Sequence, residues 1–303
     1  MIVACGEAIV DLLPEEVNGD PMYRPVLGGS LYNVAVGMGQ LGGEAGYLWE
    51  LSSDKLGEAL LGHLQRVGVN TSGVRIGNRP SVVAVVDLSG PEPTYAIADP
   101  GHVMVDTMPP PIPAGTTCLH IGSAVLAREP VSTNIGSVAA TAPLVSMDYN
   151  VRPPSVSDWD VYRDRLIELS RTVDIVKAST ADLEALKVGD PTAFMKARLE
   201  EGAALVILTA AEKGAYAFTR HGEAFAPTRA VTLVDTVGAG DSFMCGCLVH
   251  LQKTHGMSRS SIEALDDAAL SAMLAYGQTC AAIVCGRRGA AMPTVADVEA
   301  FKG

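Results

Sequence analysis

Short apolar runs and helical patterns alternate along the second half of this 303-residue chain. The apolar runs predict short strands, and the stretches between them predict helices at 161–170 and 181–186. Strands that alternate with helices form a parallel sheet covered on both faces, and ligands bind beyond the carboxyl ends of its strands. The predicted strands are residues 117–121, 144–147, 173–176 and 205–208.

The first half of the chain has a mixed pattern. Residues 2–10 predict a strand, and the leucines spaced along 54–67 predict a helix. Gly28-Gly29-Ser30 predicts the start of another helix, with Ser30 as its N-cap. Residues 75–105 change to short strands separated by a Gly/Pro-rich turn at 89–93. This stretch predicts a small sheet outside the strand–helix alternation.

Composition narrows the classes of partner. The net charge of −12 argues against a nucleic-acid footprint, which needs clustered Lys and Arg. No uninterrupted apolar run approaches the roughly 20 residues that span a bilayer, so we expect no membrane segment. The six cysteines are scattered without a Cys-x-x-Cys pair. They predict reduced, buried thiols and a cytoplasmic protein.

The run from Val234 to Phe243 holds the most informative chemistry. Its small residues Gly238, Ala239 and Gly240 let the backbone turn tightly and present unpaired N–H groups at the start of a helix. That end of a helix attracts anions. Asp241 would lie in the first helical turn, where its carboxylate can accept a proton from an attacking hydroxyl. Anion-binding amides beside a base suit phosphoryl transfer.

The sequence Asp-Thr-x-Gly-Ala-Gly-Asp-Ser-Phe at 235–243 closely resembles the signature of the ribokinase-like carbohydrate kinases. The resemblance implies an α/β fold with a mostly parallel central sheet, helices on both faces and a small β lid. It also implies that ATP and Mg²⁺ bind over the Gly-Ala-Gly turn and that Asp241 is the catalytic base. The implied core is 1–11, 26–74 and 106–303, and the implied lid is 12–25 and 75–105.

Sugar-binding residues follow from the same resemblance. The first strand is similar to a family strand that ends in a substrate-binding aspartate, here Asp11, and Gly28, Gly29 and Asn33 match residues that contact sugar hydroxyls. Tyr95 lies in the implied lid. The run Met147 to Pro153 is similar to the Asp-x-Asn-x-Arg-Pro run of bacterial fructokinases and 2-keto-3-deoxygluconate kinases. It adds Asn150 and Arg152, whose guanidinium can hold a phosphate or carboxylate as a fork.

The resemblance also implies nucleotide and metal sites. Nucleotide-binding residues are expected around the 205–208 strand and its neighbour: Lys177, Ser179, Thr209, Lys213 and Gly214. Where the family often has Asn-x-x-Glu near magnesium, this chain has Ser179 and Asp182, which keep oxygen atoms with shorter reach. A monovalent cation site, for K⁺, is implied at Asp235, Val237, Arg287 and Gly289. Lids of this family often pair, which implies a homodimer.

Three hypotheses for function remain open. The first is a fructokinase-like sugar kinase. The second is a kinase of the same fold for 2-keto-3-deoxygluconate, ribose, a nucleoside or an aminoimidazole riboside. The third is a sugar-binding regulator without activity, against which the intact Asp241 counts. Two other nucleotide folds are disfavoured: no Gly-Lys-Ser or Gly-Lys-Thr exists for a P-loop, and the Gly-x-Gly-x-x-Gly at 37–42 lies too late in its predicted helix.

Overall fold

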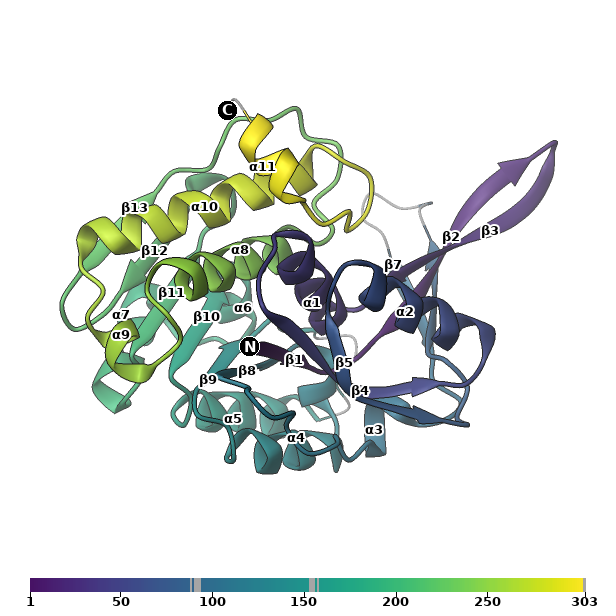
Figure 1. Ribbon diagram of the computed structural model, residues 1–303, viewed down its shortest axis with the longest axis horizontal. Helices are drawn as coiled ribbons and strands as arrows, with labels where there is room; N and C mark the ends of the chain where they lie inside the picture. The colour runs from purple at the N-terminus through teal and green to yellow at the C-terminus, as the bar shows by residue number, and fades with distance from the viewer. Residues whose placement is uncertain (88, 90–93, 153–155, 157, 302–303) are drawn as a thin grey trace.

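A computed structural model describes residues 1–87, 89, 94–152, 156 and 158–301. Two sheets organise the fold, a large one in the body and a small one that projects from it (Figure 1). Leu88 and Pro153 lie outside the described residues, as do Gly90 to Pro93 of the expected turn.

The large sheet has nine strands in the order β13-β12-β11-β10-β9-β8-β1-β4-β5. Strands β11, β10, β9, β8, β1, β4 and β5 are parallel, as the alternating pattern predicts, and all of them except the edge strand β5 are largely buried. At one end of the sheet, the edge strand β13 and its neighbour β12 form antiparallel pairs and were not predicted. The bounds are β1 Ile2–Cys5, β4 Ala45–Ser52, β5 Asn70–Gly77, β8 Cys118–Gly122, β9 Val145–Asp148, β10 Ile175–Ser179, β11 Leu205–Thr209, β12 Ala215–Phe218 and β13 Glu223–Ala226.

Helices cover both faces of this sheet, with α1, α8 and α10 on one face and α4 and α5 on the other (Figure 1). The bounds are α1 Ser30–Gln40, α2 Lys55–Arg66, α3 Val103–Asp106, α4 Val131–Ala139, α5 Trp159–Ser170, α6 Thr180–Ala185, α7 Pro191–Glu201, α8 Ala239–Thr254, α9 Arg259–Glu263, α10 Asp267–Cys285 and α11 Val295–Ala300, with short 3₁₀ turns at Ala124–Ala127 and Ala211–Lys213.

Close packing between α1, α8 and α10 depends on small residues. A Cβ on Gly37 would lie 2.5 Å from the Cys245 sulfur, and one on Gly277 would lie 2.7 Å from the Cys247 sulfur. The glycines at 37–42 therefore serve helix packing, as the sequence indicated. All six cysteines are free thiols, five of them buried.

Helix α10 is the one helix in the described part of the chain that is long and apolar enough to cross a bilayer. Its mean hydropathy is 1.5, and 56% of the 18-residue window is buried inside the protein. Its partners there include α8 and β13, so it packs as a core helix does.

The small sheet has the strand order β3-β2-β6-β7, with bounds β2 Ile9–Val17, β3 Asp20–Gly28, β6 Val83–Asp87 and β7 Thr94–Ala98. The β2–β3 hairpin pairs without interruption from Ile9 and Gly28 to Val17 and Asp20. Residues 9–11 and 26–28 thus belong to the small sheet, and 75–77 pair with β4 in the large one. These strands run across the expected boundaries between core and lid: β2 continues past residue 11, β3 past residue 26 and β5 past residue 75.

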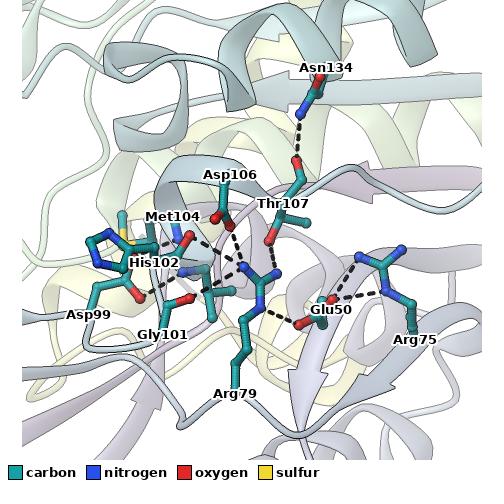
Figure 2. Close-up of polar contacts among 11 residues, drawn as sticks. Glu50, Arg75, Arg79, Asp99, Gly101, His102, Met104, Asp106, Thr107 and Asn134 are labelled. Carbon is teal, nitrogen blue, oxygen red and sulfur yellow. Dashed lines mark hydrogen bonds and ion pairs between the residues drawn. The ribbon is translucent and has the colours of Figure 1, made fainter.

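An ion-pair cluster around the buried Glu50 ties the small sheet to the body (Figure 2). Glu50 on β4 is 8% exposed and accepts hydrogen bonds from Arg75 and from Arg79 Nε, the latter at 2.6 Å. Arg79 also donates to the carboxylate of Asp106 and, at 2.6 Å, to the hydroxyl of Thr107. It therefore joins the connection that enters β6 to the connection that leaves β7. Burial alone would raise the pKa of Glu50, but the two arginines outweigh it and lower that pKa.

Candidate active site

The carboxyl ends of β1, β8, β9 and β10 meet at one edge of the large sheet, as parallel strands require. The chain turns sharply at this edge. Gly6 has φ 156° and Gly122 has φ 154°, and a Cβ on Gly122 would lie 2.3 Å from the carbonyl oxygen of Asp148. The N-termini of α1 and α8 come to the same edge, because Ser30 at the first position of α1 contacts Asp241 at the start of α8.

Asp241 lies in the first turn of α8 and is 9% exposed. Two side chains of α1 hold its carboxylate: the Ser30 hydroxyl donates to Oδ1 at 2.7 Å, and the Asn33 amide donates to Oδ2 at 3.0 Å. The amide of Asn150, which follows β9, donates to the Ser30 oxygen at 2.8 Å. The structure therefore brings together three residues predicted separately, with Ser30 as the link between them.

The expected N-cap role of Ser30 is wrong. The N-cap of α1 is Gly29, at φ 102°, and Ser30 is the first residue inside the helix. A Cβ at Gly29 would lie 2.6 Å from the Glu7 carbonyl oxygen, so only glycine fits there. This close approach frees the Ser30 hydroxyl to contact Asp241 instead of capping its own helix.

Helix α8 begins with amide donors that its own helix does not use. Its N-cap is Gly238 in the left-handed region, at φ 78°, and no side chain caps it. The Ala239 amide bonds to the Thr236 carbonyl and the Ser242 amide to the Gly238 carbonyl. Gly240 and Asp241 lie between them, at positions whose amides have no intrahelical acceptor. Gly240 is exposed, and it directly precedes Asp241.

Predicted sugar-binding residues on the small sheet lie close to one another. A Cβ on Gly28 would lie 3.1 Å from Asp11 Oδ2, so these two residues touch across the β2–β3 pair. Burial raises the pKa of Asp11 to about 6. Tyr95 is 45% exposed, and burial followed by the charges of Asp11 and Asp235 raises its pKa.

Arg152 lies beyond β9 and is exposed. Its guanidinium donates to the neighbouring Val151 carbonyl at 3.1 Å. Its positive charge opposes the rise that burial causes in the pKa of Glu7 and of Tyr95. It therefore stands at the site edge with most of its donors free of side-chain carboxylates among the described contacts.

Both carboxylate oxygens of Asp182 accept hydrogen bonds from the protein itself. Its Oδ1 accepts from the Val151 amide at 2.7 Å, and its Oδ2 accepts from the Ser179 amide at 2.8 Å and the Ser179 hydroxyl at 2.7 Å. Ser179 and Asp182 thus form the capping box at the start of α6. No group of three or more His, Cys, Asp or Glu suited to a metal occurs in the part of the chain that the structure describes. The arrangement gives Asp182 a structural task and does not fit direct magnesium ligation.

Asp235 joins the two loops of the predicted cation site. Its Oδ1 accepts from the Val237 amide at 3.0 Å, and its Oδ2 accepts from the Gly289 amide at 2.8 Å. Arg287 turns away: its guanidinium pairs with Asp297 on α11 and lowers the pKa of that carboxyl to about 2. Asp235, Val237 and Gly289 are therefore together, whereas the side chain of Arg287 serves to anchor α11.

The predicted nucleotide loop follows β11. Thr209 ends the strand beside Ser179 of β10, and Lys213 is exposed in the short turn that follows. Gly214 has φ 117°, and a Cβ there would lie 2.3 Å from the Ala226 carbonyl oxygen. Gly214 is thus required for the turn into β12. A surface hollow of about 370 Å³, lined by Lys196, Phe218 and Glu223 among others, contains none of the predicted site residues.

Sequence reasoning missed Glu7. It follows β1, is 2% exposed, and its Oε2 is buried with no hydrogen-bond partner among the described residues. Burial raises its pKa to about 7; the Ser123 hydroxyl and Arg152 oppose this rise, and the Asp241 charge adds to it. The only signal in the sequence was an acidic residue inside an apolar strand, directly after a glycine.

A carboxylate held beside helix amides without intrahelical acceptors, at the carboxyl edge of a parallel sheet and next to a small second sheet, is the arrangement expected of a phosphotransferase with a ribokinase-like fold. The model of the pfkB family carbohydrate kinases matches residues 1–296. The chain belongs to this family, and the expected family and fold class are confirmed.

Proteins similar in sequence and in structure agree with this assignment to the family. A fructokinase of Rhizobium leguminosarum bv. trifolii is 34% identical over 279 residues, covering 89% of this chain and 85% of that protein. A fructokinase of Klebsiella pneumoniae is 33% identical over 308 residues, covering 97% and 96%. The crystal structure of a fructokinase with bound ATP from Xylella fastidiosa superposes with a TM-score of 0.88 at 24% identity, over 98% of this chain and 96% of that one.

Proposed function

We propose that this protein is a cytoplasmic kinase that transfers the terminal phosphoryl group of MgATP to a hydroxyl of fructose. One observation carries the proposal: the Asp241 carboxylate, held by Ser30 and Asn33, lies in the same helical turn as two amides without intrahelical acceptors. The fructokinase relatives at 33–34% identity support fructose as the acceptor.

Asp241 accepts the proton of the attacking hydroxyl in this mechanism. The bonds from Ser30 and Asn33 fix the plane of its carboxylate, so the base is oriented before the substrate arrives. The Gly240 and Asp241 amides, at the positive end of α8, stabilise charge on the transferred phosphoryl group. Since phosphoryl transfer has a loose transition state, this positioning and charge stabilisation supply most of the catalysis.

Acceptor and donor are held by different elements. We assign the sugar to Asp11, Gly28, Gly29, Asn33, Tyr95, Asn150 and Arg152. We assign the nucleotide to Ser179, Thr209, Lys213 and Gly214, beyond the carboxyl ends of β10 and β11. Magnesium enters on the phosphates of ATP, because the Asp182 oxygens already accept three hydrogen bonds from the protein.

A coupled assay of ADP release tests this function. MgATP would be combined with fructose, ribose, 2-keto-3-deoxygluconate and aminoimidazole riboside in separate reactions. Turnover on fructose alone is expected. Turnover on the keto-acid sugar would instead assign Arg152 to a carboxylate and would move the protein to another acceptor. Sugar binding without ADP release would identify a regulator and overturn the proposal.

We also propose that K⁺ activates the enzyme. Asp235 and the backbone carbonyl oxygens near Val237 and Gly289 would hold the ion, and Asp235 already joins these loops next to the N-terminus of α8. Turnover is expected to rise when KCl replaces tetramethylammonium chloride at equal ionic strength. Equal rates in the two salts would remove potassium from the proposal.

Two copies of the chain would pair through their small sheets. The apolar side chains of Val17, Met22 and Tyr23 are 47%, 52% and 54% exposed on the β2–β3 hairpin, which projects from the body (Figure 1). Apolar surface of this kind marks an interaction site. Sedimentation is expected to show a dimer that Met22→Lys with Tyr23→Glu converts to a monomer. A monomeric wild type would contradict the pairing.

A further inference from the structure

A buried ion pair lies directly behind the phosphoryl-transfer turn. Lys177 on β10 and Asp148 on β9 are register neighbours, so their side chains point to the same face of the sheet. Lys177 Nζ donates to Asp148 Oδ2 at 2.7 Å, and the two residues are 3% exposed each. The remaining oxygen, Asp148 Oδ1, is buried without a hydrogen-bond partner among the described residues.

The ammonium faces the start of α8. A Cβ on Gly240 would lie 3.3 Å from Lys177 Nζ, so the charge sits against the turn that presents the open amides. Burial opposes the charged form of Lys177, but Asp148, Asp182 and Asp241 outweigh burial and raise its pKa. On the other side, His120 of β8 is kept neutral: burial and then the Lys177 charge lower its pKa to about 3.

Stability alone gives no reason to keep this pair. Removing two charges from water is costly, and a buried pair is often matched or exceeded in stability by uncharged residues of similar size. The lysine ammonium has three N–H donors, and Asp148 is the one acceptor found for them in the described part of the chain. Much of the hydrogen-bonding capacity of the pair is therefore unused among the described residues. Its ammonium nevertheless lies against the turn at the start of α8.

We propose that Lys177 is a positioning residue of the proposed phosphoryl transfer. Its ammonium, fixed by Asp148, adds positive potential behind the Gly238–Gly240 turn and so strengthens the hold of the α8 amides on the phosphoryl group. It also counterbalances the negative charge that Asp241 brings to the same place. In this role Lys177 acts through the turn and does not contact the nucleotide, which differs from the direct nucleotide binding expected from the family resemblance.

Kinetics of charge-neutral variants test the role. Lys177→Met should lower kcat by about 10- to 100-fold, the effect of one unit charge about 6–12 Å away at an effective dielectric of about 20, and should leave KM for the sugar within about threefold. Lys177→Met with Asp148→Asn should regain the urea midpoint lost by the single variant, because no lone charge stays buried. Its kcat should nevertheless stay low.

Two further variants separate charge from packing. Lys253→Met makes the same change in the last turn of α8, where the ammonium donates to the Leu41 carbonyl at 2.7 Å, and should leave kcat unchanged. Asp148→Asn keeps the ammonium and should retain kcat within about tenfold of the wild type. A double variant with wild-type kcat, or an Asp148→Asn variant as slow as Lys177→Met, would overturn the proposal.

A binding measurement keeps this inference distinct from the proposed function. Inorganic tripolyphosphate, titrated calorimetrically, probes the turn without any sugar or nucleoside. The double variant should bind it about tenfold more weakly than the wild type, and Lys253→Met should bind it equally well. Equal affinity in the double variant, or no binding to the wild type, would refute the role of Lys177. Weaker binding by a protein that phosphorylates no sugar would refute the proposed function alone.

Discussion

Replacing Asp241 by asparagine removes the proposed base while keeping its size. Asparagine can accept the Ser30 hydrogen bond that the carboxylate accepts at 2.7 Å, so the side chain should stay in place. Asp241 is in the first turn of α8 and not its N-cap, so the helix loses no cap. The perturbation is therefore limited to proton acceptance, one negative charge and the Asn33 bond, because the Asn33 amide must turn its oxygen towards the new NH2 group.

The expected loss follows from the chemistry of a positioned base. General base catalysis contributes about 10²- to 10⁴-fold, which corresponds to about 3–5 kcal/mol of barrier. Because Ser30 and Asn33 already hold the carboxylate, the oriented base should deliver this full range. We expect kcat to fall by at least about 100-fold and KM for fructose to stay within about threefold, since several other residues bind the sugar.

Steady-state ADP release at saturating MgATP measures this change. Asp190→Asn is the matched control, because Asp190 caps α7 away from the site and asparagine caps a helix equally well. A control with wild-type rates shows that the exchange of aspartate for asparagine is harmless in itself. Asp241→Asn turnover within tenfold of the wild type would remove this residue from the proton transfer.

Three further changes probe the surroundings of the base. Ser30→Ala should lower kcat about tenfold with little change in the urea midpoint, because Asp241 loses one orienting bond; an unchanged kcat would show that this bond does not matter. Arg79→Met should lower the free energy of unfolding, measured in urea, by about 1–3 kcal/mol, since Glu50 keeps only Arg75; no loss would mean that the cluster in Figure 2 does not stabilise the fold. Glu7→Gln should raise stability above pH 7: the native pKa of Glu7, about 7, exceeds its ordinary value, so its carboxyl lowers stability as pH rises from about 4.5 to 7. Parallel stability curves of the two proteins over pH 4–8 would contradict this.

The strands and the chemistry of α8 were predictable because each depends on local sequence. Buried parallel strands appear as short apolar runs, and the Gly-Ala-Gly-Asp sequence combines backbone freedom with a charged side chain in one turn. The register of β12 and β13 was not predictable, since these two strands are short and their pairing is set by turns and neighbours.

Contacts between distant segments explain the other differences. The link from Asp241 to Ser30 spans 211 residues, and the pair of Lys177 with Asp148 spans 29. Periodicity carries no information on such pairs, because it reports which face a residue occupies and not which side chain faces it. For the same reason, Asp182 was expected near magnesium, while the structure commits it to the Val151 amide and to Ser179.

The proposed base and anion donors belong to one turn of α8, whereas the residues assigned to the acceptor come from α1, β2, β3, β7 and the segment after β9. Substitutions among the residues assigned to the acceptor can therefore change the preferred substrate without altering the turn at the start of α8. A protein built in this way is suited to diverge towards new alcohols, because a changed preference does not require reinventing the reaction.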